Sequence, residues 1–205
     1  TSGTYADFYV IRAPHDSVDL PVVVCPFHEG RNHGEQAFLG RGTGEYQVAP
    51  ATLSAASGTT IEHPDGKGAS AALVGMALHG GDRVRTSGGG SAVLQFADGS
   101  TATVSGGSDV TVLQSFLDGA ATAPLYTVLR QDLGDIDYKV HSGSKFDVVT
   151  PTATASARGT EFEIQVSGGA LQQFKLISGK AVLTTLSRSA WVLNPMQVVG
   201  TITNL

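Results

Sequence analysis

The stretch that most constrains this fold runs from Phe146 to Val166 and alternates apolar with polar side chains. Phe162, Ile164 and Val166 fall on one face of an extended chain, and the polar residues between them fall on the other. Because successive side chains of a β-strand point to opposite faces, this alternation predicts a half-buried strand. Pro151 has no backbone donor and Gly159 tolerates a tight corner. The stretch therefore predicts three short strands separated by a proline break and a glycine corner.

Most of the chain repeats this pattern of short alternating runs stopped by glycine, of which there are 26 among 205 residues. Asp98-Gly99 between two alternating runs is a strong hairpin signal. Residues 111–121 are the one ambiguous segment, and Gly119 argues against a long helix there. Strands that recur every ~10 residues are typical of a β-sandwich, a barrel or a β-solenoid. We expect an all-β, short-stranded β-solenoid-like or β-sandwich domain with an N-terminal β extension.

Charge and composition exclude several classes of function. The formal net charge is −5 with only 13 lysines and arginines, so the basic patch that nucleic acid or an anionic membrane requires is missing. No run approaches the ~20 apolar residues of a membrane-spanning helix. Cys25 is the only cysteine, which rules out an internal disulfide. It either pairs between chains or is a buried thiol, and we favour the thiol.

Several segments, in the right order, resemble the signature segments of the FecR domain family. They are Gly81–Thr86 with Ala92–Ser100, Leu129–Val140, Phe146–Val166, Ile177–Val182 and Val192–Val199. Within them the motif residues that we single out as structural are Asp82, Asp98, Gly99, Pro151, Arg158, Gly159 and Thr160. Ala157 stands where the family usually has valine, and Met196 where it has glycine. The resemblance covers about residues 53–205.

The resemblance implies an all-β, solenoid-like domain that works outside the cytoplasm, whether secreted, on the cell surface or in the periplasm. In its best-known members this domain is the periplasmic part of a regulator that relays siderophore signals from an outer-membrane receptor to a sigma factor. Residues 1–52 lie outside the resemblance. We therefore expect an N-terminal extension with a donor or edge strand (1–52) followed by a FecR-like domain (53–205).

Two groups of residues have the chemistry of metal ligands. Imidazole and carboxylate suit Zn²⁺ or Ni²⁺, and they occur together in the polar loop of His28, Glu29, His33 and Glu35. Clustered carboxylates suit Ca²⁺, and they occur at Asp132, Asp135 and Asp137. Neither group has a recognised ligand spacing, so we favour a solvated loop for the first and an outward strand face for the second.

No constellation in the sequence supports catalysis, and we expect neither an enzyme nor a cofactor. Cys25 and His28 could form a nucleophile–base pair, but the flanking prolines and apolar neighbours argue against it. Ser87 and Ser178 lack a nucleophile-elbow context. The glycines after Ser87 are not followed by the lysine and helix of a phosphate loop. Arg158, beside the glycine corner, is expected to bind backbone carbonyls or a carboxylate such as Glu161.

Three hypotheses of function follow, and the first is a secreted structural protein that assembles with copies of itself. An exposed apolar strand is an aggregation liability unless something covers it. Such a strand is expected near the N-terminus and includes Tyr5, Phe8, Tyr9, Val10 and Ile11. Such a strand could fold back on its own domain. Inserted instead head to tail into neighbouring sheets as a donor strand, it would build an open filament or surface layer.

The second hypothesis is a periplasmic signal or adaptor domain that binds an envelope protein through a sheet edge. The third is a carbohydrate-binding module that stacks sugars on aromatic rings. Its candidate platforms are Tyr5, Tyr9, Tyr46, Tyr126, Tyr138 and Trp191. We rank self-assembly first and signalling second.

Overall fold

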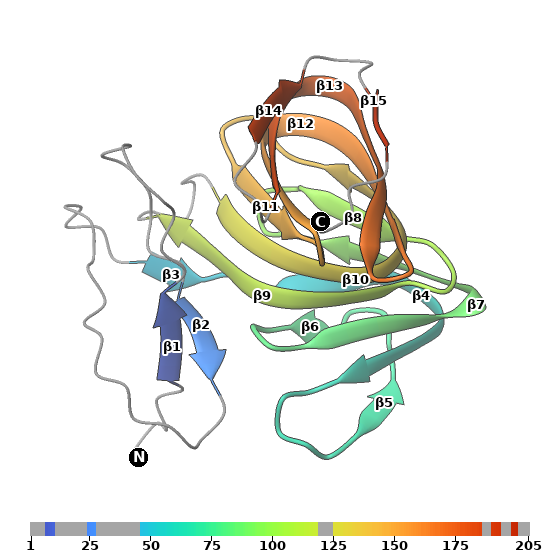
Figure 1. The fold of residues 1–205 in the computed structure, drawn as a ribbon. Coiled ribbons are helices and arrows are strands. Elements are labelled where there is room, and N and C mark those ends of the chain that lie inside the picture. Colours follow the sequence, from blue (N-terminus) through green and yellow to red (C-terminus); the bar gives the residue numbers. More distant parts are fainter. Residues whose placement is uncertain are drawn as a thin grey trace.

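The computed structural model describes residues 7–10, 24–27, 46–118, 125–185, 190–193 and 198–200 of the chain. Every regular element in this part is a β-strand, which confirms the all-β class (Figure 1). Within the same ranges there is no helix of the length and apolarity that a membrane crossing needs. The strands are β1 (Asp7–Val10), β2 (Val24–Phe27), β3 (Tyr46–Val48), β4 (Ala51–Glu62), β5 (Ala69–Ala71), β6 (Ala77–Leu78), β7 (Arg83–Gln95), β8 (Thr101–Val104), β9 (Asp109–Asp118), β10 (Leu125–Lys139), β11 (Lys145–Val149), β12 (Ala153–Ser167), β13 (Ala170–Thr185), β14 (Ala190–Leu193) and β15 (Val198–Val199).

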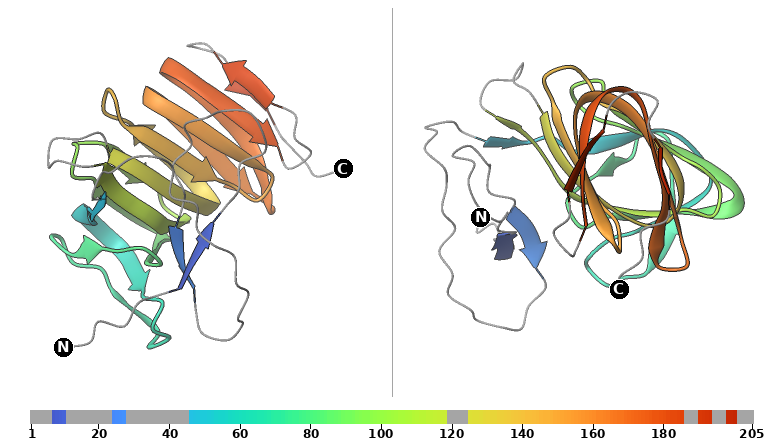
Figure 2. Two further views of the ribbon diagram at one scale, coloured as in Figure 1. Left: turned by 90° about the vertical axis from the view of Figure 1, so that its left-hand side faces the viewer. Right: turned by 45° about the horizontal axis from the view of Figure 1, so that its top comes forward.

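Long strands that change partners along their length close the main sheet on itself. The first residues of β7, Arg83–Arg85, pair with β9, and its last residues, Ala92–Gln95, pair with β8. Strand β10 in turn pairs with β9 along Leu125–Leu133 and with β8 along Ile136–Lys139. The pairings β7–β8–β10–β9–β7 therefore form a closed, barrel-like ring. The right-hand view of Figure 2 looks along the axis around which the sheet curls, and the strands of this ring are green to yellow there.

A second ring shares β10 with the first. Strand β11 runs parallel to the first half of β10 and antiparallel to β12, and β12 returns to pair with the second half of β10. Beyond the rings, β13 and β14 extend the sheet at one end, and β4 and β5 extend it at the other. Nine of the described strands have two to five residues, as expected, but the other six have 10 to 16, among them β12 with 15 and β13 with 16.

Strand β12 continues through the glycine corner at which the sequence predicted two separate strands. Gly159 has a φ of +56°, a conformation that residues with a Cβ rarely adopt. The Thr160 hydroxyl accepts the Arg158 N–H at 3.1 Å and donates to the carbonyl of Arg158 (2.8 Å) or of Lys180 (3.0 Å). Because this hydroxyl satisfies the backbone groups at the corner, β12 bends while it stays paired with β13.

Strand β4 contains a matching corner. Thr59 lies in the position of Thr160, and its hydroxyl donates to the carbonyl of Ser57 (3.1 Å) or of Ser91 (2.8 Å) on β7. The local sequences also correspond, since ATLSAASGT in β4 parallels ATASARGT in β12. The β4–β7 and β12–β13 pairs are therefore two copies of one bent structural unit.

Aromatic rings form a continuous series through the main core. Phe96 meets Phe146 edge-on with ring centroids 5.0 Å apart, and Phe146 lies 6.0 Å from Tyr138. Tyr138 stacks on Phe162 at 4.9 Å, and Phe162 stacks on Phe174 at 5.5 Å. Aromatic pairs at such separations add to the stabilisation from burial. This aromatic series connects the two closed rings of strands to β13.

The N-terminal β extension pairs within its own chain. Strand β1 runs antiparallel to β2, with Phe8 opposite Pro26 and Tyr9 opposite Cys25. Strand β3 joins the main sheet by pairing with β9. The strand expected to enter a neighbouring molecule is thus hydrogen-bonded to β2, while Tyr5 and Ile11 lie outside the described residues. The division between residues 52 and 53 stays a prediction.

Candidate protein-interaction face

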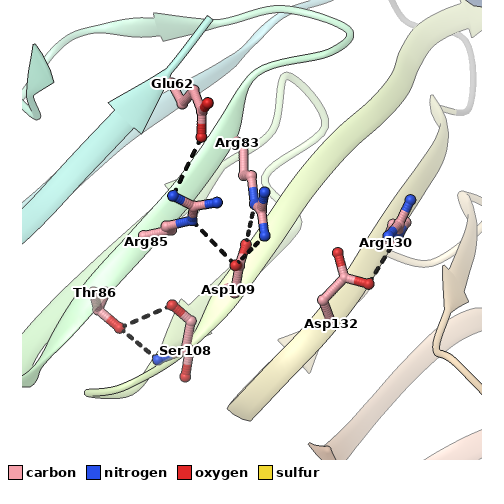
Figure 3. A network of polar contacts seen from close by, with 8 residues as sticks. All are labelled: Glu62, Arg83, Arg85, Thr86, Ser108, Asp109, Arg130 and Asp132. Carbon is pink, nitrogen blue, oxygen red and sulfur yellow. Dashed lines mark hydrogen bonds and ion pairs between the residues drawn. The ribbon is translucent and has the colours of Figure 1, made fainter. Parts of the chain in front are cut away.

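A row of charged side chains crosses the outward face of β4, β7, β9 and β10, and we call it the charged ladder (Figure 3). This row forms because successive side chains of each strand point to opposite faces of the sheet. Val84 and Val110 point into the core, so Arg83, Arg85 and Asp109 point outward. The ladder consists of Glu62, Arg83, Arg85, Asp109, Arg130 and Asp132.

Asp109 is the centre of the ladder because it binds two arginines. Arg83 donates from Nε to Asp109 Oδ1 at 2.7 Å and from Nη2 to Oδ2, which is a bidentate pair. Arg85 donates from Nε to the same Oδ2 at 3.2 Å and places its Nη1 3.3 Å from Glu62 Oε2. The hydrogen bonds with Asp109 raise the pKa of Arg83 above its usual value. These hydrogen bonds and ion pairs therefore hold the four side chains in fixed orientations toward one another.

Two further polar contacts lie beside this centre. Ser108 donates its N–H to the Thr86 hydroxyl at 2.9 Å, which holds the turn before β9 against β7. Arg130 donates to Asp132 on the same strand at 2.9 Å. With three positive and three negative groups the ladder is balanced. It can therefore orient a partner by matched charges more than attract one from a distance.

The ladder ends beside an open edge of the sheet. Strand β5 pairs with β4, with Ala69 opposite Glu62 and Ala71 opposite Thr60, and it is the last strand in the sheet order at that end. All three of its residues are exposed and none is charged. Within the described residues nothing pairs with the outer side of β5. A free strand edge can add a strand from another protein.

The segment after β5, residues 72–76, presents two large apolar side chains to solvent, and we call it the apolar loop. Leu73 and Val74 are each 66% exposed. Backbone hydrogen bonds fix the loop to β4, from Gly75 N to Leu53 O at 2.8 Å and from Leu53 N to Met76 O at 3.0 Å. Adjacent exposed apolar residues on a fixed backbone are typical of a protein-binding surface.

The sequence predicted neither the charged ladder nor the apolar loop as a site. The mostly apolar run at residues 71–78 predicts one strand from sequence alone, but the structure divides it into the end of β5, the loop and β6. The signal that could have revealed the loop is Gly75, which interrupts the apolar run. Alternation did place Arg83 and Arg85 outward, but nothing in the sequence indicated that Asp109 lies between them.

Several residues of the predicted FecR motif bind the backbone of neighbouring segments. The buried Asp82 accepts the His79 N–H at 2.8 Å and lies 2.7 Å from His63 Nδ1. Asp98 accepts both the N–H (2.8 Å) and the hydroxyl (2.7 Å) of Ser100, at the hairpin turn formed by Gly99. The Ser100 hydroxyl also accepts the His141 N–H, which ties this turn to the segment after β10.

Other predicted motif residues lie at bends. Pro151 is half-buried at the bend before β12. Arg158, however, is exposed, and its guanidinium makes no hydrogen bond or ion pair with the residues that the structure describes. The expectation that this side chain binds backbone carbonyls or Glu161 is wrong. The contacts at the corner come instead from the backbone of Arg158 and the hydroxyl of Thr160.

The candidate metal ligands do not converge where the structure describes them. Asp132 binds Arg130, and Asp135 accepts a hydrogen bond from Gln165 at 3.2 Å. No cluster of three ligating side chains occurs in the described ranges. Desolvation, followed by the charges of Glu163 and Asp135, raises the pKa of Asp137. His28, Glu29, His33 and Glu35 lie outside the described residues, as does the side chain of Cys25.

The tyrosines that the structure describes do not present open platforms for sugars. Tyr138 is buried in the core, where its hydroxyl donates to Gln131 Oε1 at 3.0 Å and burial raises its pKa. The ring of Tyr126 is also buried. Tyr5 lies outside the described residues, and so do the side chains of Tyr9, Tyr46 and Trp191.

Comparison with known proteins supports one of the three hypotheses. Residues 82–182 match the family model described as FecR protein. No curated protein matches the chain. Two crystal structures of a protein from Parabacteroides distasonis ATCC 8503, described provisionally as an anti-sigma factor, are similar at 16% identity and a TM-score of 0.45. They match 58% of this chain, which spans 54% of that protein, and we draw nothing further from so distant a likeness.

The family match corrects our first hypothesis of function. A self-assembling filament protein, with copies of itself as partners through Tyr5, Phe8, Tyr9, Val10 and Ile11, is not what a FecR match indicates. The resemblance implies a regulator that contacts other proteins. The sequence-based ranking put the N-terminal strand first because its partner β2 was not recognised.

Proposed function

Because residues 82–182 belong to the FecR family, we propose that this chain is a non-enzymatic signal-transduction or adaptor domain that works outside the cytoplasm and binds an envelope protein. The observation that carries the proposal is the open edge of β5 beside the apolar loop. Leu73 and Val74 are exposed there on a fixed backbone. We also interpret the two rings that share β10 as successive turns of a short β-solenoid, the scaffold that presents this edge.

In the proposed mode of binding, an extended segment of the partner pairs with β5. Backbone hydrogen bonds to a sheet edge supply affinity that depends little on sequence. Selectivity then comes from apolar contacts with Leu73 and Val74 and from charges that match the ladder across β4 and β7. The half-buried Asp109 already has both arginines as partners within the chain, so its ion pairs keep the ladder side chains in place while the partner binds.

A capture experiment tests this function. Immobilised full chain is incubated with a detergent extract of the envelope of the producing cell, and retained proteins are identified by mass spectrometry. We expect an envelope receptor or regulator to be retained by the native chain and lost with the double variant Leu73→Ser, Val74→Ser. Truncation of central apolar contacts commonly costs about 2 kcal/mol or more in binding.

The matched control is Leu133→Ser, which removes an exposed leucine from β10, away from the β5 edge. This variant should retain the same protein as the native chain. Failure of the native chain to retain any envelope protein would contradict the proposed function. Equal retention by the double variant would contradict the assignment of the β5 edge.

A further inference from the structure

The outer face of β9, β10 and β11 carries a second apolar cluster, separate from the main core. We call it the outer cluster, and it consists of Phe116, Tyr126 and Val128. Strand pairing places Tyr126 directly opposite Phe116, and their rings meet at 5.3 Å with an angle of 62°. On β11 the residues opposite Tyr126 and Val128 are Lys145 and Asp147, which belong to the outward face.

The outer cluster is buried although it faces away from the core. Phe116 is 9% exposed, Tyr126 8% and Val128 2%. The described neighbours that pack against it, Leu113 and Val149, lie on the same strands and cannot form a second layer. An outward aromatic pair on a single sheet would be largely exposed to water unless another element covered it.

Strand β3 does not provide this cover. It pairs with β9 edge to edge, with Val48 opposite Phe116, and Val48 is itself 76% exposed. The hairpin of β1 and β2 is better placed, because β2 lies against β9. Figure 1 shows the hairpin on the side of the molecule where β3 and one end of β9 lie. Their sequences, DFYV and VCPF, contain a single charged residue, Asp7.

We propose that the β1–β2 hairpin is an intramolecular ligand of the outer cluster and acts as a built-in cover of this apolar surface. The Tyr126 hydroxyl donates to Asp147 at 2.7 Å, so its ring stays available for apolar contact while its polar tip is satisfied. The N-terminal extension is thereby held on the FecR domain by side-chain packing as well as by β3. The proposal is independent of the β5 edge, because β5 is the last strand at one end of the sheet order and pairs with none of β9, β10 and β11.

Hydrogen exchange on the full chain tests the cover. In the variant Phe116→Ser we expect amides of residues 7–10 and 24–27 to exchange about tenfold faster than in the native chain, while β12 and β13 keep their protection. The control Leu133→Ser should leave the hairpin unchanged. Unchanged exchange of the hairpin in Phe116→Ser would overturn the proposal.

A second measurement decides the case in which Phe116→Ser loosens the whole fold. The full chain with Phe116→p-benzoylphenylalanine keeps an aromatic ring at this position and is photoactivated. Crosslinks within one chain to peptides that contain residues 7–10 or 24–27 support the cover. Crosslinks only to other segments, crosslinks between two chains, or none would overturn it.

Discussion

At the scale of single residues, hydroxyl and carboxylate side chains hold the strands where their pairing is irregular. The Thr160 hydroxyl accepts one backbone N–H and donates to one of two carbonyls at the bend, and Asp82 ties the start of β7 to two histidine-bearing segments. A buried backbone group without a partner costs about 1–3 kcal/mol, so such residues make the bends possible. The exposed side chain of Arg158 makes no such contact with the residues that the structure describes.

Asp137 allows a prediction of pH dependence. Its pKa is raised in the folded chain, first by desolvation and then by Glu163 and Asp135. The folded state therefore binds this proton more tightly than the unfolded state, and the ionised carboxylate opposes folding at pH values above the raised pKa. We expect Asp137→Asn to raise the free energy of unfolding at neutral pH. This gain should disappear as the pH falls below the ordinary carboxyl value of about 4.

Urea unfolding at neutral and acidic pH measures this difference. Asp65→Asn is a control of opposite sign, because hydrogen bonds with Lys67 lower the pKa of the exposed Asp65. That variant should gain no stability at neutral pH. A gain for Asp137→Asn that is the same at both pH values would contradict the assigned cause.

At the scale of elements, long strands change direction at internal bends, where the sequence predicted that one strand ends and another begins. Alternation correctly predicted the strand residues around Gly159, but it predicted two separate strands. It cannot show that the Thr160 hydroxyl binds the backbone at the glycine corner and so lets one strand continue. The close approach of β12 and β13 at this bend requires a glycine at position 179 of β13, whereas Gly159 on β12 is favoured by its positive φ. A Cβ at Gly179 would lie 2.7 Å from the carbonyl oxygen of Gly159.

Gly179 and Gly99 form a matched pair for testing this close approach. Their φ angles are +84° and +86°, but a Cβ at Gly99 would meet no atom within 4 Å. We expect Gly99→Ala to cost about 1–2 kcal/mol of unfolding free energy from backbone strain alone. Gly179→Ala should cost about 1–3 kcal/mol more, because the backbone must also move. Equal losses in urea unfolding would show that packing at the bend is loose.

At the scale of the whole molecule, the fold class followed from the sequence but the closure of the rings did not. Period-two alternation identified most strands, and the Asp98-Gly99 signal located the β7–β8 hairpin. Ring closure depends on β7 and β10 each pairing with different neighbours along their two halves. That information lies in long-range register, which local alternation does not contain.

Shared strands predict that the main sheet unfolds as one unit. Strand β10 belongs to both rings, and the aromatic series connects them to β13, which pairs with β14. The single tryptophan, Trp191, lies in β14. We expect its fluorescence and the far-ultraviolet circular dichroism of the chain to change at the same urea concentration. Two separate midpoints would show that the C-terminal strands unfold on their own.

The brevity of β5 has a consequence for the timing of any encounter at this edge. A visiting segment finds only three residues with which to form backbone bonds. So short a binding edge favours fast dissociation of the partner. The residence time of the partner then depends chiefly on contacts with Leu73 and Val74 of the apolar loop. Fast dissociation suits a signalling domain, because the domain must release one partner before it can respond to the next signal.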